Sequence, residues 1–155
     1  MIHGFERVLV TTDLSPLGDR AVSFAFGAVD PGGKVYLLHV VEPVHVPSPL
    51  YAHYSPGRTP TLEEKRRQED ELAAKMRALV PPESQARGVV AEVLVVESDD
   101  VAPAIVEAAE RLDVQAICLA THGRTGISKA LFGSVAEEVV RSTGRAVLLI
   151  PPPRA

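Results

Sequence analysis

Apolar residues concentrate in five short stretches, at residues 8–12, 35–41, 89–96, 114–120 and 146–150. The first, second and last are rich in Val, Leu and Ile and do not alternate with polar residues. Continuous apolar strands of this kind are typical of parallel sheets that helices cover on both faces. We therefore interpret all five stretches as strands.

Helical patterns separate these strands. Ser15-Pro16 supplies an N-cap hydroxyl and a proline in the first turn, and Pro31-Gly32-Gly33 ends that helix. A second helix begins at the capping box Thr61 to Glu64 and ends at Pro81-Pro82. The first half of the second helix, residues 63–71, is polar throughout, so we expect it to project into solvent.

A third helix spans residues 101–112 and is capped by Ser98 or Asp99, and a fourth begins at a capping box over 134–137 and ends near 143–144. The resulting alternation of strands and helices predicts an α/β fold, an open doubly wound five-stranded parallel sheet with helices on both faces. We expect residues 1–155 to form a single domain.

Ligands in such folds bind beyond the carboxyl ends of the strands, where the strand order reverses. The loops that follow Val10, Val41, Val96 and Ala120 are therefore the candidate binding segments. The loop over residues 43–60 is long and contains five prolines. Long loops often cover sites, although a mobile surface excursion remains the alternative.

Composition narrows the function. With 46% apolar and 23% charged residues, the 155-residue chain is globular, and its net charge of −4 excludes the basic surface of a nucleic-acid binder. Cys118, the sole cysteine, lies in an apolar run and permits neither an intramolecular disulfide nor a thiolate metal cluster. No run approaches the ~18 apolar residues of a membrane span. We expect a cytoplasmic protein with a buried thiol.

The segment from Ala120 to Gly126, followed by Gly133-Ser134, leaves a strand and opens a helix. Glycines let the backbone approach a ligand closely, and free amides at a helix start suit phosphate. Arg124 and Lys129 are the nearby cations. Glycine-rich turns are nevertheless common, so this segment alone is weak evidence for phosphate binding.

This segment resembles the nucleotide-binding pattern G-x2-G-x9-G-[S/T] of the universal stress proteins, and Gly123-x9-Gly133-Ser134 matches its second half. Residues 8–15, 37–41 and 135–140 also resemble the family, in the expected order over nearly the whole chain. The resemblance implies strand order 3-2-1-4-5 and ATP, with Mg²⁺ or Mn²⁺, as the ligand. It implies a site formed by Thr11, Thr12, Asp13, Val40, Ala120, His122, Gly123, Arg124, Gly133, Ser134, Val135 and Ala136.

The resemblance also implies individual roles. Thr12 and Asp13 would flank the adenosine, with the Asp13 carboxylate accepting hydrogen bonds from ribose hydroxyls, and Val40 would meet the adenine through its backbone. Gly123, Gly133, Ser134 and Val135 would hold the phosphates. The Ser134 hydroxyl could reach a metal ion, whose other ligands are unknown.

Plainer interpretations of these residues stay open. Asp13 could instead form an Asx-turn or a cap before the helix that begins at Ser15. Ser134 could serve only as the N-cap of the helix that it precedes. We interpret His39 as a satisfied core histidine, and His122 as orienting the backbone rather than transferring protons.

Two positions depart from the family pattern. Ala120 stands where the pattern has its first glycine. Alanine is strained at this position if the glycine is needed for positive φ, and is tolerated if the glycine serves only close approach of a ligand. Gln115 replaces a frequent acidic residue, which we interpret as a surface difference.

We find no Ser/His/Asp set, metal-ligand spacing or placed pair of carboxylates in the sequence. We therefore favour an ATP-binding stress-response or signalling module over a slow ATP hydrolase or nucleotidyl-transfer enzyme. An interaction protein of the same family that binds no nucleotide is a third alternative. The apolar last strand, residues 146–150, predicts a homodimer formed through an edge of the sheet.

Overall fold

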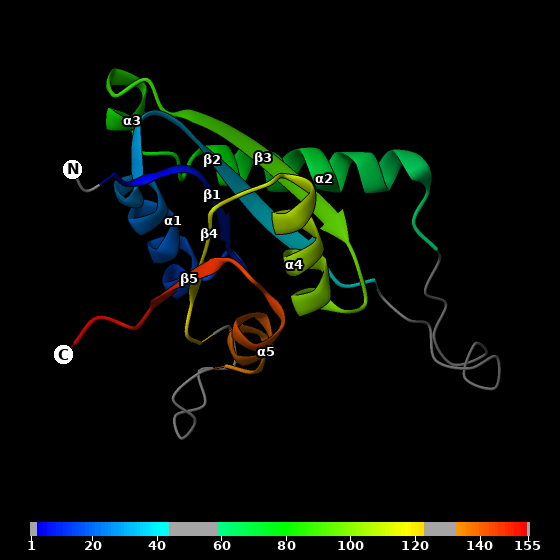
Figure 1. The fold of residues 1–155 in the computed structure, drawn as a ribbon. Coiled ribbons are helices and arrows are strands. Elements are labelled where there is room, and N and C mark those ends of the chain that lie inside the picture. The colour runs from blue at the N-terminus through cyan, green and yellow to red at the C-terminus, as the bar shows by residue number, and fades with distance from the viewer. Residues whose placement is uncertain (1–2, 44–58, 123–132, 155) are drawn as a thin grey trace.

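The computed structural model describes residues 3–43, 59–122 and 133–154. The expected loop over 43–60 therefore lies almost wholly outside the described residues, as do Gly123 and Arg124. The strands are β1 (Phe5–Thr11), β2 (Val29–Val41), β3 (Val90–Glu97), β4 (Ala116–Ala120) and β5 (Ala146–Ile150). They form an all-parallel sheet in the order β3-β2-β1-β4-β5 (Figure 1). The predicted strand order is confirmed.

Helices cover both faces of this sheet. They are α1 (Pro16–Ala28), α2 (Leu62–Arg77), α3 (Glu83–Ala86), α4 (Val101–Arg111) and α5 (Ser134–Ser142). Figure 1 shows α1 and α4 on opposite sides of the strands. The four-residue helix α3, which the sequence did not predict, leads into β3. Within the described residues, no helix combines the length and apolar character that crossing a bilayer requires.

Two hydrophobic clusters separate according to the alternation of side chains along the strands. Val8 and Val10 pack with α1 and with Met76 of α2, whereas Leu9 packs with α4 and α5 through Ile105 and Val139. Because apolar side chains leave both faces of the central strands, helices must cover both faces. This double burial explains the continuously apolar strands of the sequence.

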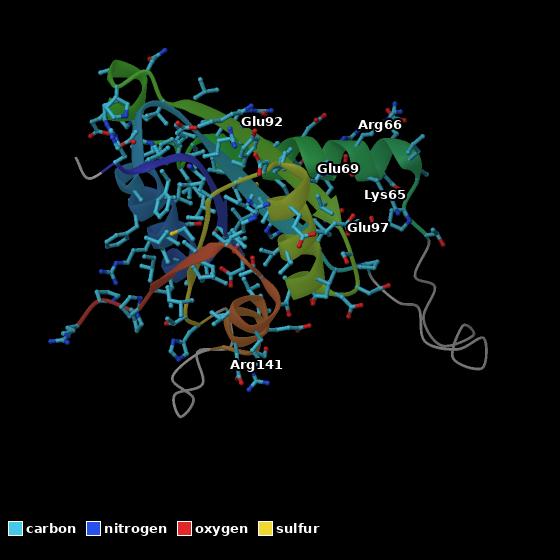
Figure 2. All side chains as sticks on the ribbon, in the orientation of Figure 1. Lys65, Arg66, Glu69, Glu92, Glu97 and Arg141 are labelled. Carbon is cyan, nitrogen blue, oxygen red and sulfur yellow. The ribbon has the colours of Figure 1, made fainter. Side chains whose placement is uncertain are left out.

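Two of the predicted helix starts are confirmed. The Ser15 hydroxyl caps α1 by accepting a hydrogen bond from Gly18 N at 3.1 Å. Thr61 and Glu64 form the predicted capping box at α2. The polar half of α2 is largely exposed, as expected, and Figure 2 shows Lys65, Arg66 and Glu69 along it.

Two other start signals were wrong by one or two residues. Asp100 is the N-cap of α4, and Ser98 instead accepts a hydrogen bond from Asp100 N at 3.2 Å in the preceding turn. Gly133 is the N-cap of α5, which leaves Ser134 as its first helical residue without a capping bond. The hydroxyl of Ser134 is therefore not needed to cap α5.

The strand β2 is longer than predicted, because it begins at Val29 and includes the Pro-Gly-Gly segment. A register shift between Phe5 and Arg7 accompanies this segment, and Gly32 adopts φ 79°. Glycine tolerates this backbone conformation at no steric cost. The Pro-Gly-Gly signal therefore marks a bulge inside a strand and not the end of the preceding helix.

Cys118 is fully buried in β4, and its thiol contacts the carbonyl of Ala21 at 3.4 Å. Burial raises the pKa of this thiol to about 12. Because the thiolate is the reactive form, Cys118 is an inert packing residue, as the sequence predicted.

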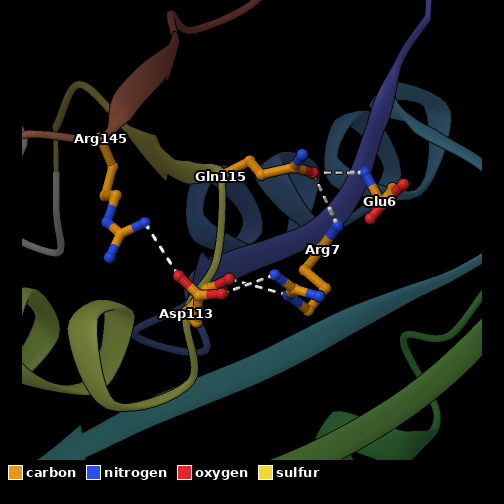
Figure 3. Close-up of polar contacts among 5 residues, drawn as sticks. All are labelled: Glu6, Arg7, Asp113, Gln115 and Arg145. Atoms are coloured by element: carbon orange, nitrogen blue, oxygen red, sulfur yellow. Dashed lines mark hydrogen bonds and ion pairs between the residues drawn. The ribbon is translucent and has the colours of Figure 1, made fainter.

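A polar network closes the amino ends of the strands (Figure 3). The side-chain oxygen of Gln115 accepts hydrogen bonds from Glu6 N at 2.6 Å and Arg7 N at 3.2 Å. Arg7 donates to the Asp113 carboxylate at 2.7 Å, and Arg145 contacts the same group at 3.3 Å. Gln115 is exposed, but it is more than a surface difference because it joins the starts of β1 and β4.

Candidate functional site

A cavity of about 600 Å³ lies at the carboxyl ends of β1, β2 and β4. All the predicted site residues that the structure describes line it: Thr11, Thr12, Asp13, Val40, Ala120, His122, Gly133, Ser134, Val135 and Ala136. In the strand order, β1 and β4 are the neighbours at which the chain reverses its direction of winding. The cavity thus occupies the switch point at which doubly wound folds bind ligands.

Thr12 is a buried node between β1, β2 and α1. Its amide donates to Leu38 O at 3.1 Å, and its carbonyl accepts a hydrogen bond from His39 Nδ1 at 2.8 Å. Its hydroxyl donates to Asp19 at 2.9 Å and accepts from Leu14 N at 3.0 Å. These bonds fix the direction in which the chain leaves β1.

Asp13 follows this node and makes the Asx-turn that the sequence left open. Its Oδ1 accepts hydrogen bonds from the amide of Ser15 at 3.0 Å and from the Ser15 hydroxyl. Leu14, between them, adopts φ 61°, a conformation that costs free energy for a residue with a side chain. The turn holds the Asp13 carboxylate at the cavity wall, so the structural role and a binding role are compatible.

His39 is buried and satisfied, as predicted for a core histidine. It also lines the cavity. Because Thr12 O can only accept, Nδ1 of His39 carries the proton in this contact. The Thr121 hydroxyl similarly lies 2.8 Å from Nδ1 of His122, which orients that ring at the opposite side of the site.

Gly133 lets the chain close tightly between β4 and α5. Its amide donates a short hydrogen bond to Thr121 O, and a Cβ placed on Gly133 would lie 2.9 Å from the same oxygen. Thr121 N donates to Ile150 O at 3.0 Å, which ties this turn to β5. The start of α5 is therefore fixed against the end of β4.

The first turn of α5 presents unused amides to the cavity. The first helical bond runs from Glu137 N to Gly133 O at 3.0 Å, so the amides of Ser134, Val135 and Ala136 have no acceptor within the helix. All three residues line the cavity. Free amides together with the positive end of the helix dipole favour an anionic group such as phosphate.

Ala120 is the last residue of β4 and pairs with Ile150. Leu14 and Asp113 are the only non-glycine residues of the described segments with positive φ. Alanine is therefore unstrained at position 120, and the strained alternative is excluded. The methyl group of Ala120 instead limits how closely a ligand can approach the backbone at this position.

Sequence reasoning missed several lining residues, because they carry no motif. Gly18, Gln68, Leu72, Val101, Ile105 and Thr121 all line the cavity. Gln68 lies in the polar half of α2, residues 63–71, that we expected to project into solvent, and Leu72 follows directly after it. Whether these side chains reach the cavity depends on how α2 packs against the sheet, which the helical periodicity of the sequence does not predict. The described part of the chain holds no group of three or more His, Cys, Asp or Glu suited to a metal ion.

Comparison with known proteins identifies the family. The model of the universal stress protein family matches residues 4–151. The chain belongs to this family. A curated relative, universal stress protein MJ0531 of Methanocaldococcus jannaschii, is 28% identical over 151 residues, which are 97% of this chain and 84% of the relative.

Solved structures share the fold of this universal stress protein. The hypothetical protein MJ0577 has a TM-score of 0.74 at 23% identity and is matched over 97% of this chain and 98% of its own. The Archaeoglobus fulgidus protein in complex with dAMP has a TM-score of 0.57 at 21% identity, with 97% and 99% covered. A universal stress protein in complex with cAMP has a TM-score of 0.66 at 20% identity, with 95% of this chain and 97% of its own covered. An Arabidopsis thaliana protein of the family with AMP bound has a TM-score of 0.57 at 16% identity, with 95% and 92% covered.

Two glycines of α1 provide a matched test of the site's packing. A Cβ on Gly18 would lie 2.5 Å from Asp13 Oδ1 and 2.9 Å from the Thr12 hydroxyl, whereas one on Gly27 would meet nothing within 4 Å. We expect Gly27→Ala to stabilise the protein by about 0.5–1 kcal/mol, since alanine favours helices. Gly18→Ala should destabilise it by about 1–3 kcal/mol, as overpacking does. Urea denaturation measures both changes, and equal effects would contradict the close packing around Gly18.

Proposed function

We propose that this universal stress protein binds an adenine nucleotide in the cavity, ATP included, and acts as a stress-response or signalling module whose shape or partner binding depends on occupancy. One observation carries the proposal. The unused amides of α5 and the Asp13 carboxylate face the same cavity at the strand-order reversal. Relatives of the same fold solved with AMP, dAMP and cAMP support an adenine ligand.

In this proposal the two ends of the cavity bind different parts of the nucleotide. The amides of Ser134, Val135 and Ala136 hold the phosphates, and the Asp13 carboxylate accepts from ribose hydroxyls. The backbone of Val40 meets the adenine. Mg²⁺ or Mn²⁺ arrives with the phosphates, and the Ser134 hydroxyl, which is not occupied by capping, is its candidate protein ligand. The reducing cytoplasm is the compartment we propose, consistent with a single inert thiol.

Calorimetry with AMP, ADP and ATP, with and without Mg²⁺, tests this proposal. We expect a dissociation constant near ~1 μM, about −8 kcal/mol. Asp13→Ala should weaken binding because the ribose loses its acceptor. Gly133→Val should abolish it because the larger side chain collides with Thr121 O. Glu110→Ala, an exposed α4 position that does not line the cavity, is the control. No heat with any of the three nucleotides would contradict the proposal, and steady phosphate release from ATP would favour the hydrolase alternative.

We further propose that two copies pair through β5. In the described sheet β5 pairs with β4 alone, so one edge of this apolar strand has no partner. Ala146 N donates to Gln115 O, and by strand alternation the amides of Val147 and Leu149 point to the free edge. An apolar edge without charge invites pairing with another chain.

Side chains beside this edge support the pairing. Phe24 of α1 is 47% exposed, and the Arg20 guanidinium lies over its ring at 5.3 Å. Arg20 also donates to Pro151 O, directly after β5. An exposed aromatic ring is thus held next to the end of β5, where a second copy paired along the free edge of this strand would cover it.

Light scattering tests the dimer. We expect the unmodified protein to be a dimer at tens of micromolar and Leu148→Lys to be a monomer, because a charge within β5 opposes strand pairing. Leu148 also packs against the core, so far-UV circular dichroism must show that the variant is folded. A monomeric unmodified protein would refute the pairing.

A further inference from the structure

The helix α2 contributes two side chains to the cavity even though most of its polar half is exposed. Gln68 and Leu72 line the cavity one helical turn apart. Lys65, on the same helical face, lies 3.5 Å from the Glu97 carboxylate at the end of β3 (Figure 2). Met76, fully buried against the sheet, anchors the other end of the helix. Contacts of α2 with the sheet on both sides of Gln68 in the sequence, at Lys65 and at Met76, therefore keep Gln68 at the cavity.

The cavity has two chemically different ends. The α5 end offers unused amides. The β2 end is lined by the apolar side chains of Val41, Leu72 and Ile105. Leu72 belongs to α2, whose Met76 joins the first hydrophobic cluster, whereas Ile105 of α4 belongs to the second. These aliphatic groups approach the end of β2 from opposite faces of the sheet, an arrangement that suits a flat ring. With phosphate at α5, the base of a nucleotide is directed to this end.

We infer that Gln68 recognises the edge of the bound base through its side-chain amide, which makes it a specificity-determining residue. This inference rests on the proposed nucleotide binding. The amide offers one acceptor oxygen and an NH₂ donor. The Watson–Crick edge of adenine offers the complementary pair, the N6 amino donor beside the N1 acceptor. Gln68 is exposed and lines the cavity, so its amide is accessible to a ligand bound there.

A single substitution that introduces a charge distinguishes recognition of the base by Gln68 from a role in which Gln68 only lines the cavity. Gln68→Glu leaves only acceptors, which would still meet the amino group of adenine but would repel its ring nitrogen. On its Watson–Crick edge guanine presents two adjacent donors, N1–H and the 2-amino group, which suit a carboxylate. We expect Gln68→Glu to weaken AMP binding about 10-fold or more and to shift the AMP-to-GMP affinity ratio toward GMP by at least about 10-fold.

Two further variants separate hydrogen bonding from charge. Gln68→Leu removes both hydrogen-bonding functions without adding charge, so AMP affinity should fall about 10-fold. Gln85→Glu makes the same chemical change on the exposed helix α3, away from the cavity, and should leave both affinities unchanged. Comparing AMP with GMP on each variant cancels the repulsion between the new carboxylate and the phosphate, because both ligands carry the same phosphate.

Calorimetric titration of the unmodified chain and the three variants with AMP and GMP decides the matter. A ratio that moves toward GMP in Gln68→Glu alone supports the inference. If the unmodified protein binds AMP and the ratio stays constant in Gln68→Glu, the inference is overturned while the proposed function stands. If the unmodified protein binds neither AMP nor GMP, the inference is overturned. If it also binds neither ADP nor ATP, the proposed function is overturned with it.

Discussion

The geometry of the site depends on the hydrogen bonds of Thr12. This buried residue uses its amide, carbonyl and hydroxyl to join the end of β1 to β2 and to α1. An unsatisfied buried polar group costs about 1–3 kcal/mol, so removing one partner would strain the whole turn. The turn places Asp13 at the cavity wall, and Gly18 packs directly behind it, where a Cβ would lie 2.5 Å from Asp13 Oδ1.

The two ends of the sheet differ in how far their polar groups are already hydrogen-bonded within the chain. At the amino ends, Arg7, Asp113 and Gln115 bond with one another and with the strand backbones, so that end is closed by the chain itself. At the carboxyl ends, α5 begins with amides that the helix does not use. Hydrophobic clusters pack against both faces of the strands, and the residues that carry these amides line the cavity. In the part of the chain that the structure describes, helix amides without a helical acceptor therefore lie at the carboxyl ends of the strands, where we propose that the phosphates bind.

Much of this arrangement could be predicted from the sequence. Continuous apolar strands imply two covered faces. The motif residues lie after β1 (Asp13), near the end of β2 (Val40) and at the start of the helix that follows β4 (Ser134), so their convergence follows from parallel topology. Local signals were less reliable, since Gly133 and not Ser134 caps α5. That cap depends on the short bond between Gly133 and Thr121, which no local pattern contains. Gln68 was unpredictable because it reaches the cavity only through the tertiary placement of α2.

Backbone amide NMR of the protein titrated with AMP tests the central claim most directly. The account predicts that the largest shifts occur at Ser134, Val135 and Ala136, where the phosphate binds, and at Val40 and Val41, where the base binds. Amides near Gln115, at the opposite end of the sheet, should be unaffected. Shifts concentrated at the amino ends of the strands, or none at the start of α5, would contradict it.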